Sequence, residues 1–169
     1  MKKIFLSAVL LVFFGNAIFA QNNEKQITAI RAEVAATNKA AAKYSKKTKN
    51  VDNISLEGAQ ATYYVSGKGL KKIVAKMYGE SYNATGEFYY QGEDLIFAFV
   101  KFNKYEMPIG SGGKSPKIVS TEEQRLYFAG GDLIRLLLGK KELKPGDERY
   151  AELKDEITGI SKKLQEEYN

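Results

Sequence analysis

The central part of this 169-residue sequence contains an internal repeat, which restricts the folds open to the chain. Residues 87–96 (EFYYQGEDLI) align without a gap against residues 125–134 (RLYFAGGDLI). Each copy is an aromatic stretch, a short turn rich in Gly and charge, and an aliphatic stretch. Gly and Asp tolerate the positive φ that a tight hairpin turn requires. The repeat therefore predicts β-hairpins.

A third copy precedes these two, at residues 63–70 (YYVSGKGL), and aligns Tyr63 with Tyr89 and Tyr127 if one extra turn residue is allowed. Three hairpins give six strands, most simply an antiparallel meander. Residues 70–77 also fit a helix ended by Gly79, because periodicity alone does not separate short apolar helices from strands. The repeat favours the strand.

The return strands of the hairpins are apolar on both faces. One face carries Ile96, Ala98, Val100, Ile134, Leu136 and Leu138, and the other carries Leu95, Phe97, Phe99, Leu133, Arg135 and Leu137. A sheet with water on one side would alternate apolar and polar residues. We therefore expect both faces to be covered, at least in part, by helices, sheet curvature or a partner.

Helical patterns flank the repeats. Asn23 and Gln26 form a passable capping box, followed by an apolar stripe of Ile27, Ile30, Val34, Ala41 and Tyr44. This predicts a lightly docked helix to about Tyr44, then a flexible stretch over residues 45–53.

The C-terminal pattern is stronger. Pro145-Gly146-Asp147 is a break followed by an N-cap, and the stripe behind it is Tyr150, Leu153, Ile157, Ile160, Leu164 and Tyr168. The predicted fold is α+β: a six-stranded antiparallel meander sheet of three hairpins, flanked by an N-terminal and a C-terminal helix.

The N-terminus has the three parts of a secretory signal: basic residues 1–3, an apolar run over residues 4–14, and a small residue, Ala20, at the expected cut before Gln21. The alternative is an uncleaved anchor, but the run is short for a membrane span. We expect a signal peptide (residues 1–20), an N-terminal helix and basic linker (21–53), and a sheet with its C-terminal helix (54–169) as one domain. The protein would be exported, to the periplasm or outside the cell, with no transmembrane segment after cleavage.

Composition limits the chemistry. Cys and His are absent, which excludes disulfides, thiolate nucleophiles, His-based triads and metal sites built on these residues. The formal net charge is +6, and loss of Lys2 and Lys3 with the signal leaves +4. The densest basic run is Lys39, Lys43, Lys46, Lys47 and Lys49. An exported protein rarely meets nucleic acid, so the run indicates either an anionic envelope component or a solvated helix end and linker.

The hairpins, with a Tyr pair (Tyr89-Tyr90), a turn Gly (Gly92) and a Leu-Ile pair (Leu95-Ile96), resemble those of small uncharacterised exported bacterial proteins. In those proteins a second hairpin is likewise followed by a Tyr-x-x-Pro-Ile loop, here residues 105–109. The resemblance covers about residues 63–138. It implies a shared fold and no activity.

Two segments carry residue types that could support chemistry. Residues 108–115 (PIGSGGKS) approach the phosphate-binding pattern GxxxxGK[ST], but Pro108 replaces the first Gly and no helix pattern follows. We interpret the segment as a hairpin connection, with Lys114 as a candidate to assist an anion nest. Asp94 and Asp132 could act as paired carboxylates or bind calcium, but Asp beside Gly is a common turn former.

The sequence thus predicts no catalytic residue, no metal ligand and no cofactor site. We expect a non-enzymatic binding or interaction module of the cell envelope. An inhibitor or immunity-type protein against a periplasmic or extracellular enzyme is the alternative, and a carboxylate hydrolase is a weaker third. The expected partner is a protein or an anionic envelope component, and homo-oligomers stay open. The candidate partner-binding residues are Tyr63, Tyr89, Tyr127, Arg135, Lys114, Lys43, Lys46 and Lys47.

Overall fold

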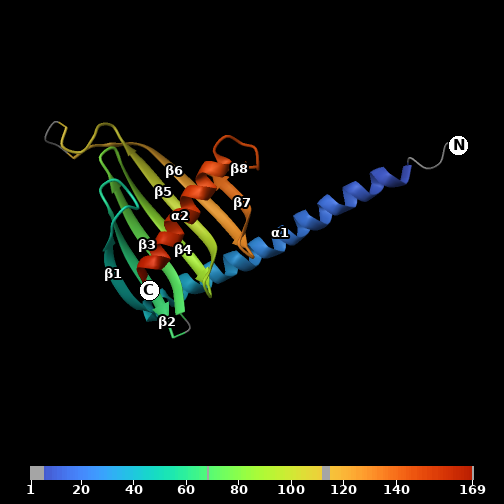
Figure 1. Ribbon diagram of the computed structural model, residues 1–169, viewed down its shortest axis with the longest axis horizontal. Helices are drawn as coiled ribbons and strands as arrows, with labels where there is room; N and C mark the ends of the chain where they lie inside the picture. Colours follow the sequence, from blue (N-terminus) through green and yellow to red (C-terminus); the bar gives the residue numbers. More distant parts are fainter. Residues whose placement is uncertain (1–5, 68, 112–114, 169) are drawn as a thin grey trace.

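The computed structural model describes residues 6–67, 69–111 and 115–168, and side chains from Gln21 onward. The chain forms one antiparallel sheet of eight strands in chain order, preceded by helix α1 and followed by helix α2 (Figure 1). The strands are β1 (Ser45–Val51), β2 (Ala59–Ser66), β3 (Gly69–Gly79), β4 (Tyr82–Gln91), β5 (Asp94–Tyr105), β6 (Ile118–Ala129), β7 (Asp132–Leu138) and β8 (Lys141–Leu143). The helices are α1 (Leu6–Ala40), a 3-10 turn η1 (Ala41–Lys43) and α2 (Tyr150–Tyr168).

The α+β class, the meander and the two flanking helices are confirmed, but six strands is wrong. The three predicted hairpins are β2–β3, β4–β5 and β6–β7, and residues 69–79 are a strand rather than a helix. The missed strands are β1 and β8. Strand β8 has three residues, and β1 (SKKTKNV) buries only Val51, so neither shows the alternation that marks a half-buried strand.

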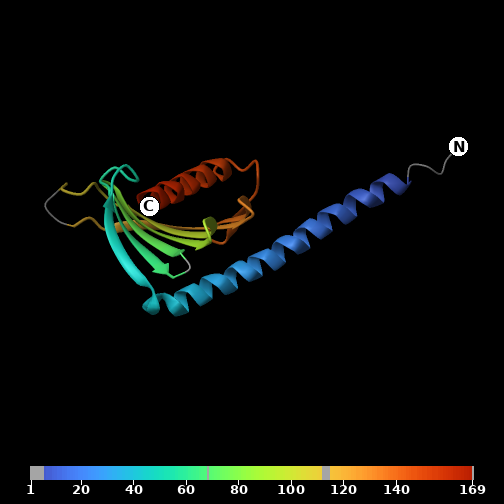
Figure 2. The same cartoon turned by 60° about the horizontal axis from the view of Figure 1, so that its bottom comes forward.

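The sheet curves around α2, which lies across its concave face (Figure 2). The helix buries Leu153, Ile157, Ser161 and Leu164 against side chains of the strands, including Tyr63, Phe88 and Leu126. Each fully buried aliphatic side chain of this stripe contributes about 1.5–3 kcal/mol to folding. The predicted C-terminal helix and its apolar stripe are therefore confirmed.

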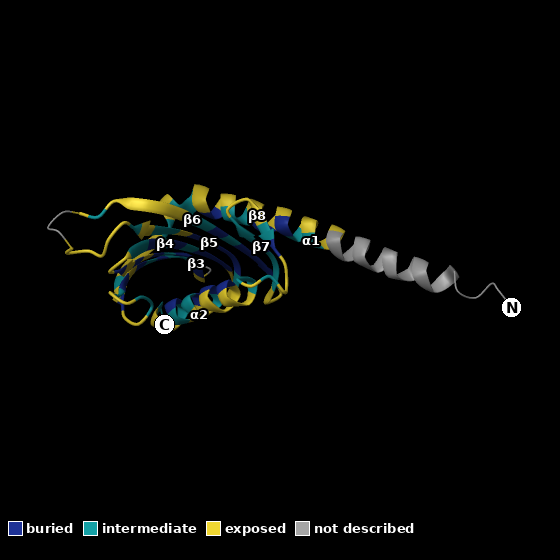
Figure 3. Ribbon diagram, turned by 90° about the horizontal axis from the view of Figure 1, so that it is seen from above, coloured by how far each residue is buried: buried dark blue, intermediate teal, exposed yellow. Residues whose placement is uncertain are grey.

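The other face of the sheet is covered by α1, at one end only (Figures 2 and 3). Ile27 and Ile30 of α1 are buried there against Tyr89, Phe97 and Tyr127. Farther along the strands this face is polar: Lys76, Thr85 and Lys101 are cross-strand neighbours, and Asn83 and Asn103 are the next such pair. Helix α2 thus covers one face of the apolar return strands and α1 covers part of the other, as their composition predicts.

Helix α1 is continuous through the predicted cleavage position. The capping box at Asn23 is therefore wrong for the full-length chain, because the preceding turn supplies carbonyl partners for those N–H groups. Residues 45–51, expected to be flexible, pair with β2 as an edge strand. Within the part of the chain that the structure describes, neither helix has the length and apolar content of a membrane span.

Candidate functional site

A row of side chains crosses seven strands on the face that α1 covers. Successive cross-strand partners are Lys46, Tyr64, Lys72, Tyr89, Phe97, Tyr127 and Arg135, one each from β1 to β7. We call this set the bulge row. Its centre is aromatic: the ring centroids of Phe97 lie 5.8 Å from Tyr89 and 4.8 Å from Tyr127. Cations flank the aromatic centre on both sides.

β-Bulges build this row, and they recur at the same place in all three hairpins. The register shifts after Tyr64, Tyr89 and Tyr127, which leaves Lys71, Ile96 and Ile134 as the extra residues of the return strands. Because the bulge interrupts alternation, Ile96 joins Phe97 in the cluster under α1, whereas Leu95 packs toward α2. The strict two-face division of the return strands expected from the sequence is wrong for this reason.

The bulges also correct the alignment of the third repeat. Ser66 pairs with Gly69, as Gln91 pairs with Asp94 and Ala129 with Asp132. The first hairpin therefore needs no extra turn residue. Tyr64, rather than Tyr63, is the counterpart of Tyr89 and Tyr127.

The described part of α1 lies along the row and supplies polar partners at both ends. Near its C-terminal end, Asn38 Oδ1 accepts hydrogen bonds from Lys72 Nζ and from Tyr89 OH, each at 3.0 Å. Glu87 Oε2 accepts from the same two groups, at 2.7 Å and 2.5 Å. Lys72 Nζ also stands 4.8 Å from the centroid of the Tyr89 ring. These contacts connect α1, β3 and β4.

The charges of Lys72 and Glu87 in this cluster are paired with each other. Burial alone would raise the pKa of Glu87, but hydrogen bonds from Lys72 and Tyr89 outweigh it and lower that pKa. Burial alone would lower the pKa of Lys72, but its bonds with Glu87 and Tyr89 raise that pKa. Burial and the bond to Glu87 raise the pKa of Tyr89. Glu87 and Lys72 are thus both charged at neutral pH, which suits a structural ion pair.

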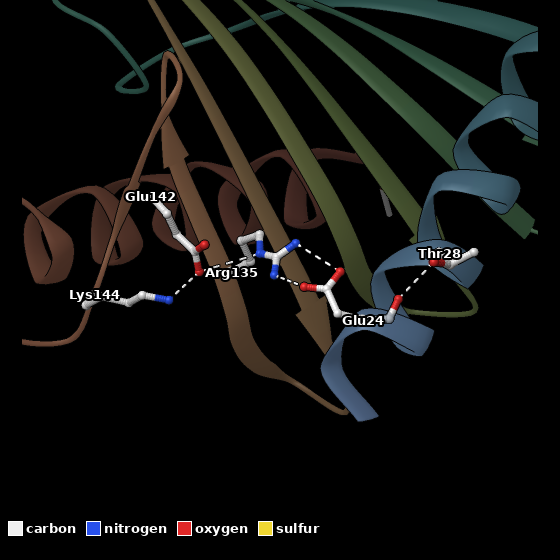
Figure 4. Close-up of polar contacts among 5 residues, drawn as sticks. All are labelled: Glu24, Thr28, Arg135, Glu142 and Lys144. Atoms are coloured by element: carbon white, nitrogen blue, oxygen red, sulfur yellow. Dashed lines mark hydrogen bonds and ion pairs between the residues drawn. The ribbon is translucent and has the colours of Figure 1, made fainter. Parts of the chain in front are cut away.

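At the other end of the row, Arg135 holds the N-terminal part of the docked helix (Figure 4). Its guanidinium forms an ion pair with Glu24 of α1, and its Nε lies 3.5 Å from Glu142 Oε1 of β8. Lys144 Nζ pairs with the same Glu142 oxygen at 2.6 Å. Arg135 is therefore an internal connector between α1 and the edge of the sheet.

The predicted partner-binding residues separate into groups. Tyr89, Tyr127 and Arg135 come together under α1, and Lys46 lies farther along the same row, 5.3 Å from the Tyr64 ring centroid. Tyr63 is on the opposite face, buried, and stacks on Tyr168 with centroids 5.6 Å apart. Lys43 is exposed in η1 and Lys47 is exposed on β1. Lys114 lies outside the described residues.

Sequence reasoning missed Tyr64, Lys72 and Phe97 as members of one row, and Asn38 as its helical partner. An alignment of the three hairpins on their two-residue turns reveals the first three. In that alignment Tyr64 matches Tyr89 and Tyr127, and Lys72 matches Phe97 and Arg135. Nothing in the sequence marks Asn38.

Carboxylates do gather at one open cleft, beside the C-terminal end of α2. Glu93 and Asp94 of the β4–β5 hairpin line it together with Lys162 and Glu166 of α2. All four side chains are exposed. Acid–base carboxylates usually rely on burial or close neighbours to tune their pKa values, so this cleft gives little support to the hydrolase reading. Asp94 and Asp132 each begin the strand after a hairpin turn, as turn formers do.

The exposed surface has a different apolar site. The large hydrophobic side chains that are exposed within the described residues are Leu56, Tyr78, Met107, Ile109, Ile118 and Val119. They come from the β1–β2 loop, the end of β3 and the β5–β6 hairpin, which all lie at the end of the sheet away from the bulge row. We call this set the apolar end. The β5–β6 hairpin that carries most of it projects beyond its neighbours (Figure 1).

Side-chain hydrogen bonds brace the root of this projecting hairpin. Asn83 donates to Tyr105 OH at 2.6 Å, Asn103 donates to Asn83 at 2.8 Å, and Thr121 donates to Asn103 at 2.8 Å. The backbone N–H of Ile109 donates to Glu80 O at 2.8 Å. These hydrogen bonds fix the base of the hairpin that carries most of the apolar end.

The chain matches no protein-family model, no curated protein and no solved structure. Its function must therefore be inferred from its own residues and geometry.

Proposed function

We propose that this chain is an exported, non-enzymatic binding module of the cell envelope, and that it engages a protein partner through the apolar end. One observation carries the proposal: six large hydrophobic side chains, 41–83% exposed, gather at one end of the sheet. Exposed apolar side chains that cluster, rather than scatter, are typical of interaction sites.

The tyrosines that the sequence suggests as partner-binding residues are buried in contacts within the protein. Tyr89 and Tyr127 are buried under α1, and Tyr63 is buried under α2. A partner could reach them only by displacing a helix. Their burial supports a structural role and moves the proposed contact surface to the apolar end.

Export is part of the same proposal and rests on the tripartite N-terminus. Cleavage after Ala20 would keep the contacts with the sheet that the described side chains of α1 make, because these run from Glu24 onward. Edman sequencing of the protein recovered from the cell envelope or the medium should then begin at Gln21. An N-terminus at Met1 in the membrane fraction would instead favour an uncleaved anchor.

An inhibitor or immunity-type protein is the second candidate. The braced, projecting β5–β6 hairpin favours it, because inhibitors commonly present a rigid loop to an enzyme. The expected target is a periplasmic or extracellular enzyme. Both candidates use the same end of the molecule, and they differ in whether the captured partner loses activity.

The test is affinity capture by the tagged chain, residues 21–169, from a cross-linked envelope fraction. The apolar-end variant carries Ile109→Ser and Val119→Ser. The matched charge variant carries Lys43→Gln, Lys46→Gln and Lys47→Gln. We expect the first to lose the captured protein and the second to keep it. Capture lost only by the lysine variant would assign binding to an anionic component instead, and unchanged capture by the apolar-end variant would contradict the proposal.

A further inference from the structure

Strand β6 is longer than the strand beside it, and this leaves part of its edge without a neighbour. Strand β7 pairs with β6 only over Gln124–Ala129, whereas β6 begins at Ile118. Ile118 and residues 120–122 therefore pair with β5 alone, and Val119 between them is the extra residue of a β-bulge. The paired part of this side of β6 ends at Glu123, whose backbone C=O accepts a hydrogen bond from Gly139 N–H at 2.7 Å. We call residues 118–122 of this edge the vacant edge.

The backbone of the vacant edge is oriented to receive another strand. In an antiparallel ladder a residue directs its N–H and C=O to the same side, and the side alternates along the strand. Because Glu123 O points toward the β7 side, the N–H and C=O of Thr121 point that way as well. Ile118, Val119, Ser120 and Thr121 are all exposed. Unpaired edges of this kind are templates for strand addition.

Strand β1 forms one outer edge of the sheet, and its side chains protect that edge from strand addition. Strand β1 presents Lys46 and Lys47 as exposed side chains, and lysine on an edge strand opposes pairing with another chain. The vacant edge has no lysine, and it carries two exposed β-branched aliphatic residues, Ile118 and Val119. Lysine therefore opposes strand addition at β1 but not at residues 120–122 of β6, the part of the vacant edge beyond the bulge at Val119.

Charge around the vacant edge selects the kind of strand. Arg149 neutralises Glu122 through two hydrogen bonds of 2.6 Å and 2.9 Å, and Arg125 pairs with Glu123 at 2.6 Å. The hydrogen bonds from Arg149 hold the pKa of Glu122 below its ordinary value. Three exposed lysines flank the edge, and their side chains have no ion-pair partner within the described residues: Lys117, Lys140 and Lys141. These lysines are the unpaired cations that an added strand would meet, whereas Glu152 and Glu156 of α2 lie near Arg149 and Glu122 on the helix side of the sheet.

We infer that the vacant edge binds an acidic, extended segment of a partner protein, which adds as a strand to β6 beside Ile118–Glu122. This inference rests on the proposed function, since Ile118 and Val119 belong to the apolar end. Backbone hydrogen bonds to Thr121 would fix the strand, and the flanking lysines would favour acidic side chains on it.

The test uses residues 21–169 and a short synthetic peptide that alternates valine or threonine with glutamate. Binding is followed by amide chemical shifts and amide hydrogen exchange. We expect saturable binding, slowed exchange at Thr121 and unchanged exchange along β1. A peptide with lysine in place of glutamate should bind about tenfold more weakly, and a peptide whose strand-facing amides are N-methylated should not bind.

A pair of variants at one position isolates the backbone bond. Thr121→Pro removes the N–H that faces the vacant edge while leaving the β5 ladder intact, as proline is tolerated at such edge positions. Thr121→Val keeps that N–H and loses only the hydroxyl bond to Asn103. We expect about tenfold weaker peptide binding for Thr121→Pro, which removes one or two hydrogen bonds, and unchanged binding for Thr121→Val. Thermal melts of both variants check that they remain folded.

Equal binding by the two variants, or no binding of the acidic peptide to the unmodified chain, would overturn the inference. So would exchange protection at Thr121 that grows with protein concentration in the absence of peptide, since a second copy would then occupy the edge. Envelope capture separates this failure from that of the proposed function. Capture that survives Thr121→Pro but not the apolar-end variant would contradict strand addition alone.

Discussion

Buried tyrosine hydroxyls show how one residue type serves different purposes on the two faces of this sheet. Tyr89 OH is hydrogen-bonded to Asn38 and Glu87 under α1, and Tyr90 OH shares a 2.9 Å hydrogen bond with Ser161 of α2. The hydroxyl of Tyr63 is buried with no hydrogen-bond partner in the described structure. Burial raises the pKa of Tyr63 to about 12. The repeat identifies these tyrosines in the sequence, but only the register shows which helix each one meets.

Removing the hydroxyl groups of Tyr63 and Tyr90 should have opposite effects on stability. Tyr63→Phe removes an unsatisfied buried group and should raise the free energy of unfolding by about 1 kcal/mol. Tyr90→Phe leaves Ser161 without its partner and should lower it by about 1–3 kcal/mol. Urea unfolding of both variants measures the difference. A loss of stability in both would show that Tyr63 OH has a partner after all.

Glu87 should make part of the stability depend on acid. Its pKa is lowered in the folded chain, so its ionised form contributes fully above its unfolded-state pKa of about 4.3 and loses that contribution as pH falls through the lower folded-state value. Glu87→Gln should be less stable than the unmodified chain at pH 7, and the two should converge toward about pH 3. Urea unfolding at a series of pH values checks this. Parallel stability curves would contradict the ion pair with Lys72.

At the scale of elements, the lysines of β1 have a structural explanation that their sequence obscures. The basic run indicates an anionic partner or a solvated helix end and linker, whereas the structure places Lys46, Lys47 and Lys49 on an edge strand. Edge lysines oppose sheet-to-sheet association. A run of like charge looks the same in a linker and on an edge strand, so the sequence could not separate the two.

Replacing the β1 lysines should therefore promote self-association. The variant with Lys46→Thr and Lys47→Thr should form concentration-dependent oligomers, which sedimentation velocity would detect. The matched control, Lys76→Thr with Lys101→Thr, loses the same charge from central strands and should sediment as the unmodified chain does. Oligomers in the control alone, or in neither variant, would contradict the role assigned to the edge.

Arg135 should control the N-terminal half of the α1 docking surface. Arg135→Gln removes the ion pair with Glu24, but the apolar contacts of Ile27 and Ile30 remain. We expect faster amide exchange in the first turns after Glu24. The free energy of unfolding should change little, because the Glu24 carboxylate is largely exposed and solvent screens its attraction to Arg135. Hydrogen exchange with mass spectrometry resolves the segments. Faster exchange throughout residues 27–38 would show that the pair holds the whole helix.

The elements divide into those that a sequence pattern can reveal and those that depend on neighbours. The hairpins and α2 follow from the aromatic-turn-aliphatic repeat and the six-position stripe, and both are present. Strands β1 and β8 form because β2 and β7 offer ladders to them. The bulges at Ile96 and Ile134 are invisible in an aligned repeat, since they shift pairing without changing the spacing of the residues.

For the whole molecule, the arrangement leaves one end of the sheet for recognition. Helix α2 fills the concave face and α1 covers the bulge row. Polar and charged side chains such as Lys76, Thr85 and Asn103 occupy much of the rest of the outer face. The six exposed hydrophobic residues of the apolar end could not be predicted from the sequence, because Ile118 and Val119 look like ordinary strand residues until β7 is seen to stop short of them.

The most direct test is hydrogen exchange on residues 21–169 in complex with the protein captured from the envelope. The account predicts slower exchange at residues 106–111 and 115–121, with residues 24–38 of α1 unchanged. Slower exchange confined to the strands of the bulge row, together with faster exchange in α1, would show that a partner displaces the helix and binds the aromatic row instead.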